Sequence, residues 1–302
     1  MMALDAWTAS LLISKVLLYL GATCAAGTVL FRLSIMGIEN RAAVGASYSA
    51  LWIGVVLTAF FGSAAIGLQA GLLADDGLRG LWNVEMIKIV MEGAAGDSFW
   101  LRSGGTLAIA VSTVLPLRAS VGVGALGAVF VALSFGLVGH ALTGNGLFLP
   151  LLVGLHFLGV SHWFGSLWPI YQSARHDGLG DAAKVADRFG QTALWTVATL
   201  ILAGVVMTVV LVQTLENLVR TPYGQLLAAK IAIVLAIGAL GALNKLRLVP
   251  RMELGDESAR NVLCRSIAWE AALMVTVFVA TAALTSLMAL PEQAASSSSG
   301  AF

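Results

Sequence analysis

Histidine is the residue type in this sequence best suited to bind a metal ion, and the chain has four histidines. His140 lies near the end of one long apolar segment, and His156 lies about two helical turns into the next. The connection between these segments is short, so we expect antiparallel neighbouring helices with both imidazoles near one end. Imidazole is a good ligand for copper, zinc, iron and nickel. Two interpretations follow: a shared metal site, or two separate polar residues that hydrogen-bond to backbone carbonyls.

The other two histidines have different settings. His162 follows His156 by six residues, and at about 100° per residue the two side chains point about 120° apart on a helix. His162 therefore faces a different neighbouring helix, or lies deeper in the same pocket, and it is a third candidate metal ligand. His176 falls in a charged stretch and is expected to be solvated.

Sulfur ligands give a weaker signal. Nine methionines and two cysteines are present, without a closely spaced methionine motif or a cysteine cluster. Thioethers suit Cu(I), but most of these methionines are expected to pack in the interior or to face lipid. Cys24 and Cys264 are likewise expected to be packing residues.

Three charged residues fall inside apolar segments, where an ionised side chain is costly and is a functional candidate for that reason. Lys15 and Lys230 have long stems that can carry the ammonium toward the membrane surface. Glu270 has no such freedom, and the expected partner for its carboxylate is Lys230. The functional interpretation is an ion or proton pathway, and the structural one is an ion pair between helices.

The elements that must position these residues follow from the composition. The 302 residues are 59% hydrophobic and 11% charged, which is too little charge to cover a water-facing surface. A helix needs roughly 20 apolar residues to cross the hydrocarbon, and the apolar segments are too long for barrel strands. The fold class is therefore all-α, a polytopic membrane helix bundle. We expect about eight transmembrane helices, over residues 8–31, 44–73, 99–116, 121–142, 149–172, 190–213, 223–246 and 262–289.

The connections set the orientation and the domain organisation. Most of the 17 Lys and Arg residues fall on one side of the predicted membrane, which is then cytoplasmic, so both termini are periplasmic. Residues 79–97 mix apolar and charged side chains, which is typical of a short amphipathic helix at the interface. We expect one transmembrane domain over residues 1–290 and a disordered periplasmic tail over 291–302. The net charge of +1 indicates no nucleic-acid partner.

Several segments resemble the CopD family of copper-resistance membrane proteins. The clearest are TPYGQLLAAK over residues 221–230 and GALNKLRLVPR over residues 241–251. The elements VGHA at His140 and LHFL at His156 also fit, and so does the start of the last helix before Glu270. The matching segments keep their order between about residues 136 and 285.

The resemblance implies copper handling at the bacterial inner membrane, with copper as the bound metal and a separate periplasmic CopC-like protein as partner. It places His140 and His156 at the family's histidine positions, and Lys230, Asn244 and Glu270 at its polar positions. Two features depart from the family pattern. Leu18 stands where many members have a histidine, and no copper-binding domain is fused to the chain. His162 is outside the pattern.

Three functions remain open. The first is copper import from periplasm to cytoplasm, which contributes to copper resistance and homeostasis. The second is a haem-binding membrane redox protein, because histidines on neighbouring helices also suit axial haem ligation. The third is a protein that assembles copper sites without moving metal across the membrane. We find no phosphate loop, nucleophile–base pair or carboxylate dyad, so we expect no enzymatic activity. The oligomeric state is not indicated by the sequence.

Overall fold

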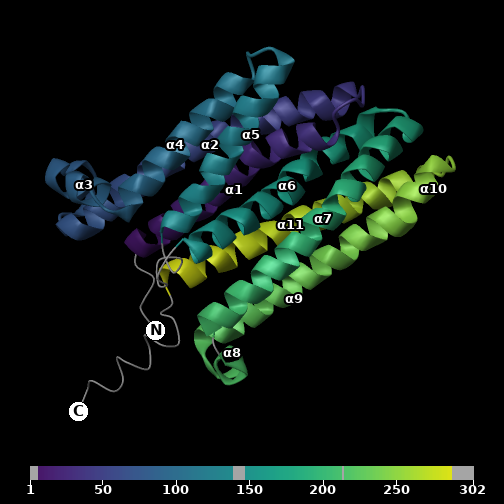
Figure 1. The fold of residues 1–302 in the computed structure, drawn as a ribbon. Coiled ribbons are helices and arrows are strands. Elements are labelled where there is room, and N and C mark those ends of the chain that lie inside the picture. Colours follow the sequence, from purple (N-terminus) through teal and green to yellow (C-terminus); the bar gives the residue numbers. More distant parts are fainter. Residues whose placement is uncertain (1–5, 139–146, 213, 288–302) are drawn as a thin grey trace.

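The fold is an elongated bundle of long helices (Figure 1). The structure, a computed structural model, describes residues 6–138, 147–212 and 214–287, and contains helices and no strand over these ranges. The long helices are α1 (Ala6–Ser34), α2 (Arg41–Ala74), α4 (Ala94–Ser112), α5 (Leu117–Ser134), α6 (Phe148–His176), α7 (Leu179–Val212), α9 (Pro222–Leu243) and α11 (Glu257–Ser286). Short helical elements are η1 (Gly77–Trp82), α3 (Val84–Met91), η2 (Phe135–Leu137), α8 (Leu215–Arg220), η4 (Asn244–Leu248) and α10 (Val249–Glu253).

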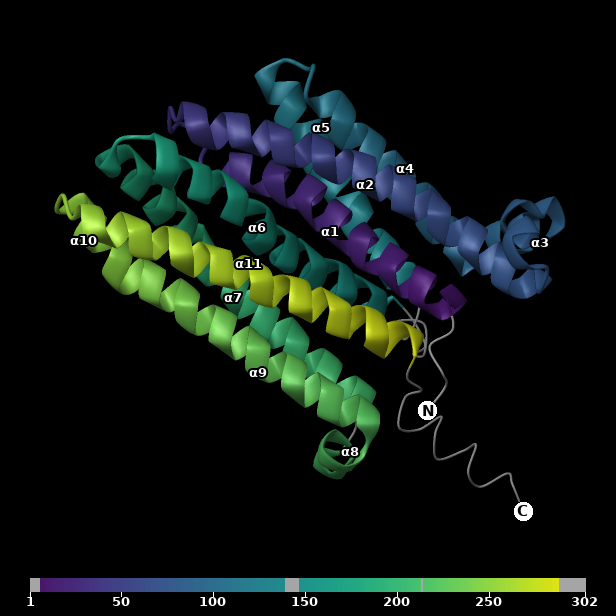
Figure 2. The ribbon, with the colours of Figure 1, turned by 180° about the vertical axis from the view of Figure 1, so that it is seen from behind.

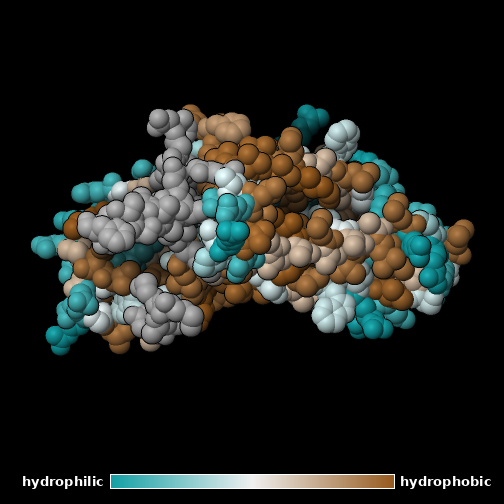
Figure 3. Space-filling model, turned by 90° about the horizontal axis from the view of Figure 1, so that it is seen from below, coloured by the Kyte–Doolittle hydropathy of each residue, from teal (hydrophilic) through white to brown (hydrophobic). Residues whose placement is uncertain are grey.

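Seven described helical segments are long and apolar enough to cross a membrane. They include α1, α2, α5 with η2, α6, α7, α9 with η4 and α10, and α11. The remaining long helix, α4, carries Asp97 and Arg102 and is not among them. The surface agrees with a polytopic bundle, because hydrophobic residues cover much of the middle and hydrophilic residues gather mainly toward the ends (Figure 3).

Helix α6 is central to the bundle. It packs against α1, α2 and α5 on one side and against α7 and α11 on the other, while α9 packs on α11. Figures 1 and 2 show α1 starting and α11 ending at the end of the bundle that carries α3 and α8, with α10 at the opposite end.

Helices α1 and α6 are held at backbone contact by two glycines. A Cβ atom on Gly27 would overlap the carbonyl oxygen of Ser161, and one on Gly165 would overlap the main chain of Gly27. Small residues allow this approach, which supplies van der Waals contact where lipid gives helices no hydrophobic reason to associate. The crossing fixes the part of α6 that carries His162 and Trp163.

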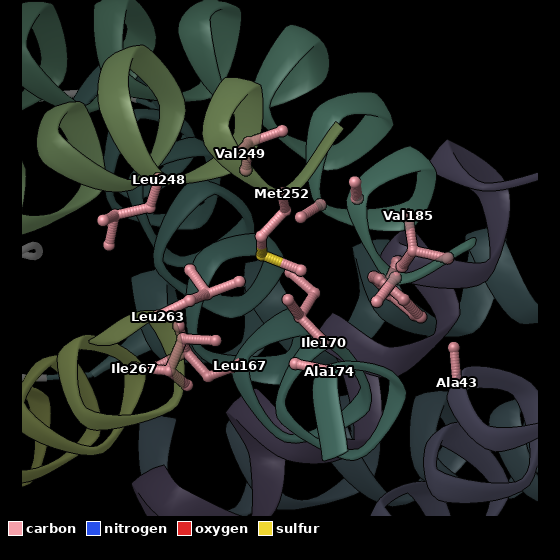
Figure 4. Packing of buried hydrophobic residues seen from close by; sticks show 14 of the residues in the cluster. Ala43, Leu167, Ile170, Ala174, Val185, Leu248, Val249, Met252, Leu263 and Ile267 are labelled. Atoms are coloured by element: carbon pink, nitrogen blue, oxygen red, sulfur yellow. The ribbon is translucent and has the colours of Figure 1, made fainter. Parts of the chain in front are cut away.

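A hydrophobic cluster closes the end of the bundle that carries α10. Leu248 and Met252, from the η4–α10 segment, lie over Ile170 of α6 and Leu263 of α11, and Val185 of α7 lies beside them (Figure 4). These side chains are almost completely buried. Basic residues of the predicted cytoplasmic side, among them Lys245, Arg247 and Arg251 of η4 and α10, lie at this end. We call it the basic end.

Two stretches that lie between the predicted transmembrane helices are also helical. Helix α6 continues to His176, and α7 already begins at Leu179, so the charged stretch 174–189 is mostly helix. Its Lys184 pairs with Asp181 at 3.0 Å on the exposed face, whereas Ala183 and Val185 are buried. This is the pattern of an amphipathic helix that continues out of the membrane. Residues 247–261, between two predicted transmembrane helices, likewise contain part of η4, all of α10 and the start of α11.

The amphipathic segment predicted over residues 79–97 is divided into η1, α3 and the first turn of α4. Asn83 ends η1 and caps α3, where its side chain accepts hydrogen bonds from the Glu85 and Met86 amides. The predicted helix 121–142 is shorter than expected at its end: α5 stops at Ser134, and η2 extends it only to Leu137. Gly136 brings this turn onto the start of α6, where a Cβ atom would overlap the Pro150 carbonyl.

Candidate functional site

His156 lies on the face of α6 that looks toward α7 and α9. A Cβ atom on Gly204 of α7 would lie 3.9 Å from the His156 ring, which also interacts with the main chain of Leu200. The Nδ1 atom of His156 is buried and has no hydrogen-bond partner among the described residues. An imidazole that donates to a carbonyl through its other nitrogen keeps a lone pair on Nδ1. This nitrogen is therefore free to bind a metal ion.

The charged neighbour of His156 is Lys230 of α9, whose ammonium is close enough to act on the ring electrostatically. The sequence interpretation paired Lys230 with Glu270, and that pairing is wrong. The described partners of Glu270 are two uncharged side chains, Trp163 and Asn244. Helical spacing placed Lys230 and Glu270 on adjacent helices but did not show which neighbour each residue faces.

His162 also faces α7, closer to the basic end than His156. Its Nδ1 atom lies 2.8 Å from the hydroxyl oxygen of Thr196, and its ring packs against Phe189 at 5.3 Å between centroids. The Thr196 hydroxyl in turn donates to the Thr192 carbonyl at 3.3 Å. In this arrangement Nδ1 donates to Thr196, and the lone pair of His162 is on Nε2. The two candidate ligands His156 and His162 share one neighbouring helix and lie about 9 Å apart along α6.

His140 falls within residues 139–146, outside the described ranges, so its pairing with His156 remains a prediction. The described surroundings give one constraint. Phe157, the residue after His156, stacks on Phe135 of η2 with 4.3 Å between ring centroids. The face of α6 that packs against α5 and η2 is thus not the face that carries His156.

A polar network lies between α6, α9, η4 and α11. Glu270 is 2% exposed, and its two carboxylate oxygens lie 2.8 Å from the indole nitrogen of Trp163 and 2.6 Å from the amide nitrogen of Asn244. The amide oxygen of Asn244 is buried without a partner among the described residues. Gly241 leaves room for the Trp163 ring, because a Cβ atom there would lie 2.7 Å from it.

Asn244 is also the first residue of the π-helical turn η4, a distortion that Pro250 helps to explain. Proline has no amide hydrogen, and its ring crowds the carbonyl four residues earlier. The helix here widens over Asn244–Leu248, and the Val249 amide bonds to the Asn244 carbonyl. Single π-helical turns inside α-helices are frequent at functional sites. The sequence interpretation named Asn244 and Glu270 but missed Trp163 as a donor, since that contact joins residues 107 positions apart.

Two further cations lie at the end opposite the basic end. The Lys15 ammonium donates to the Ser286 hydroxyl at 2.8 Å. Arg102 of α4 is 7% exposed, donates to Ser98 at 3.1 Å and lies over the Phe135 ring, with 5.4 Å to its centroid. Arg102 forms no ion pair within the described ranges and was not a candidate in the sequence interpretation.

The basic end is held by ion pairs and a helix cap. Lys245 of η4 pairs with Asp187 of α7. Asp256 caps α11 by accepting from the Ser258 amide at 2.9 Å, and it also binds Arg251 at 2.6 Å. Hydrogen bonds from Ser258 and Arg251 lower the pKa of Asp256 to about 2.

Comparison with known families decides the identity of the segment that carries the polar network. Residues 183–284, from α7 to α11, match the family model of copper resistance protein D, CopD. This segment is similar to the CopD family. The match supports a copper-resistance function for the segment, and the seven apolar helical segments support a multi-pass membrane protein.

The CopD match covers only part of the candidate site. It includes Lys230, Asn244 and Glu270, whereas His140, His156 and His162 precede it. No curated protein and no solved structure matches the chain. No group of three or more His, Cys, Asp or Glu side chains able to hold a metal ion occurs in the ranges that the structure describes.

Proposed function

We propose that this protein imports copper from the periplasm into the cytoplasm across the inner membrane of a bacterium. The match of residues 183–284 to the CopD family supports copper as the transported ion, and the apolar helices support a path through the membrane. The observation that carries the proposal is the buried Nδ1 atom of His156, which has no hydrogen-bond partner among the described residues. A buried polar atom without a partner calls for an explanation, and a bound metal ion supplies one.

In this proposal the copper ion moves along the α6–α7 interface. Met207 follows Gly204 by three residues on α7, so it shares a helix face with Gly204 and lies one turn farther from the basic end. A thioether there and the His156 imidazole offer a soft ligand pair, which suits Cu(I). His162, about 9 Å deeper, offers the next ligand through Nε2, and His140 is a candidate for the entry side.

Lys230 limits the time that copper spends at His156. Its ammonium is near the ring and repels a metal cation bound there. A site that binds too tightly would hold copper instead of passing it on, since conduction requires binding weak enough for the ion to leave. We interpret Lys230 as a group that weakens the site.

The copper donor in this proposal is a separate periplasmic copper-binding protein of the CopC type. Copper is the cargo, and no covalent chemistry takes place in the bundle, so the protein is not an enzyme.

The proposal is tested by two measurements on wild type, His156→Ala and His140→Ala. His176→Ala is a matched control, because His176 is an exposed histidine at the other end of α6. Metal analysis of the purified, copper-exposed protein should show copper near stoichiometry in wild type and control, and a loss in His156→Ala. Proteoliposomes loaded with a copper chelator should then accumulate copper beyond the amount of protein present, and only with wild type and control.

Other outcomes would change the function. Iron together with a Soret absorption band would establish haem binding instead. Copper retained in His156→Ala and His140→Ala would make both histidines structural and would contradict the proposed site.

A role in copper-site assembly without transport is the second candidate. One observation favours it. Met252 and Cys264, soft side chains near the basic end, pack in or against the hydrophobic cluster described above, so neither extends a ligand path toward the cytoplasm. Stoichiometric copper binding without accumulation in proteoliposomes would support this second function.

A further inference from the structure

The buried carboxyl group of Glu270 has no cationic partner among the described residues. It is 2% exposed, and its contacts are the uncharged Trp163 and Asn244 side chains. An ionised carboxylate removed from water is strongly destabilised unless a cation compensates for it. Two neutral donors compensate in part, but protonation removes the cost of burying the charge.

No charged group on the elements around Glu270 is described as its partner, and Arg247 of η4 and Arg265 of α11 are exposed. Helices α1, α6 and α9 pack against α11, as do η4 and α10. Their charged or titratable groups with described partners contact other residues: Lys15 with Ser286, Tyr19 with Thr285, Arg32 with Tyr48, His162 with Thr196, Arg175 with Tyr171, Lys245 with Asp187 and Arg251 with Asp256. Lys230 lies beside His156, and on α11 itself Arg260 pairs with Glu257.

The amide of Asn244 is suited to both protonation states of Glu270. An amide has a donor and an acceptor, and which way it points follows from its hydrogen-bond network. With its nitrogen toward Glu270 it donates to a carboxylate and leaves its oxygen unpartnered, as observed. With its oxygen toward Glu270 it accepts from a protonated carboxyl. The 2.6 Å separation is short for N–H···O and ordinary for O–H···O.

The position of Glu270 and the backbone geometry beside it also favour a protonated carboxyl group. Glu270 lies roughly 20 Å along α11 from its start at the basic end, which is well inside the membrane span. Asn244 opens the π-helical turn η4, where the backbone already departs from regular helix. Trp163 donates through its only N–H group in either state.

We propose that Glu270, Asn244 and Trp163 form a proton-binding site, in which the Glu270 carboxyl carries a proton that it donates to the Asn244 amide oxygen. The exchange is a simple one: the carboxylic acid releases H⁺ to water and becomes a carboxylate, and the Asn244 amide turns to present its nitrogen. The site does not depend on which ion the protein transports.

The test is infrared spectroscopy of the purified protein in lipid, compared between acid and alkaline pH. Wild type should show the C=O absorption of a buried protonated carboxyl at neutral pH. This absorption should be lost in Glu270→Gln and kept in Glu257→Gln, a matched control on the same helix whose carboxylate is exposed. Asn244→Leu should move the absorption to higher frequency, because the Glu270 hydroxyl loses its acceptor, and a merely structural role for Asn244 would not produce that shift.

Isotope labelling keeps the test independent of variants that fold poorly. In wild type with ¹³C-labelled glutamate the absorption should shift to lower frequency. The absence of a protonated-carboxyl absorption at neutral pH, or an absorption that does not respond to the label, would overturn the proposal. Neither measurement uses copper, so a failed copper assay leaves this result standing, and the reverse also holds.

Discussion

Thr196 occupies the Nδ1 atom of His162, because its hydroxyl oxygen lies 2.8 Å from that atom. The other ring nitrogen, Nε2, is then the one that can bind a metal ion. Groups that orient a metal-binding histidine are almost as important as the histidine itself. At the scale of single residues, the proposed site therefore depends on uncharged neighbours as well as on its candidate histidines. Trp163 is a second example, since its indole N–H donates to the buried carboxyl group of Glu270.

We predict that Thr196→Val lowers the copper affinity of the purified protein by about 10–100-fold, because His162 loses the partner that fixes its ring. Competition with a copper chelator measures the affinity. Thr199→Val is the control, since the described hydrogen bond of Thr199 stays within its own helix, at the Trp195 carbonyl. An unchanged affinity in Thr196→Val would remove His162 from the ligand set.

At the scale of elements, the glycine crossing of α1 and α6 is the contact most sensitive to substitution. We predict that Gly27→Ala destabilises the folded protein by about 1–3 kcal/mol, because the new methyl group overlaps the Ser161 carbonyl. Thermal unfolding in detergent measures the effect. Gly45→Ala on α2 is the control, since nothing lies within 4 Å of its would-be Cβ atom. Equal unfolding temperatures in the two variants would mean that the α1–α6 crossing is looser than described.

The start of α11 should respond to pH through its cap. Hydrogen bonds in the folded state lower the pKa of Asp256 from 3.8 to about 2. A lowered pKa means that the carboxylate stabilises the folded state at and above neutral pH, and that this contribution is lost as pH falls from about 4 toward 2. Hydrogen exchange should show the first turn of α11 opening over that range.

Asp256→Ala should open the first turn of α11 at every pH, with no further change on acidification. Asp76→Ala is the matched control, because Asp76 precedes η1 without a side-chain cap hydrogen bond. Acid-induced opening that persists in Asp256→Ala would assign the pH response to another group.

The helices were predictable from the sequence where the hydrophobic pattern that marks them lies within the helix itself. Long apolar segments gave all the spanning helices, since each must satisfy its backbone hydrogen bonds internally. The helical stretch from Leu179 to Phe189 was missed, because its burial depends on α10, more than fifty residues farther along the chain. The partners of Glu270 were missed for the same reason. Hydropathy shows that a side chain enters the membrane but not which neighbour it meets there.

At the scale of the whole molecule, the distribution of Lys and Arg predicts the orientation. We predict that a cysteine replacing Asp76, between α2 and η1, reacts with a membrane-impermeant maleimide added to intact spheroplasts. A cysteine replacing Glu253, at the end of α10 on the basic end, should react only after the membrane is opened. A background without Cys24 and Cys264 is needed. The opposite labelling pattern would reverse the orientation and contradict periplasmic termini.

The bundle divides into two halves with different surroundings. Helix α1 buries residues along most of its length, whereas α9 buries only Tyr223, Gly224 and Ile237. Most of the surface of α9 is therefore in contact with acyl chains instead of other helices. Helix α9 is about 33 Å long, close to the hydrocarbon thickness of a bilayer. Any thickening or thinning of the host membrane acts on α9 first through hydrophobic mismatch, and α9 leads directly into the π-helical turn at Asn244. The lipid composition of the cell thus has a mechanical connection to the polar network in the interior of the protein.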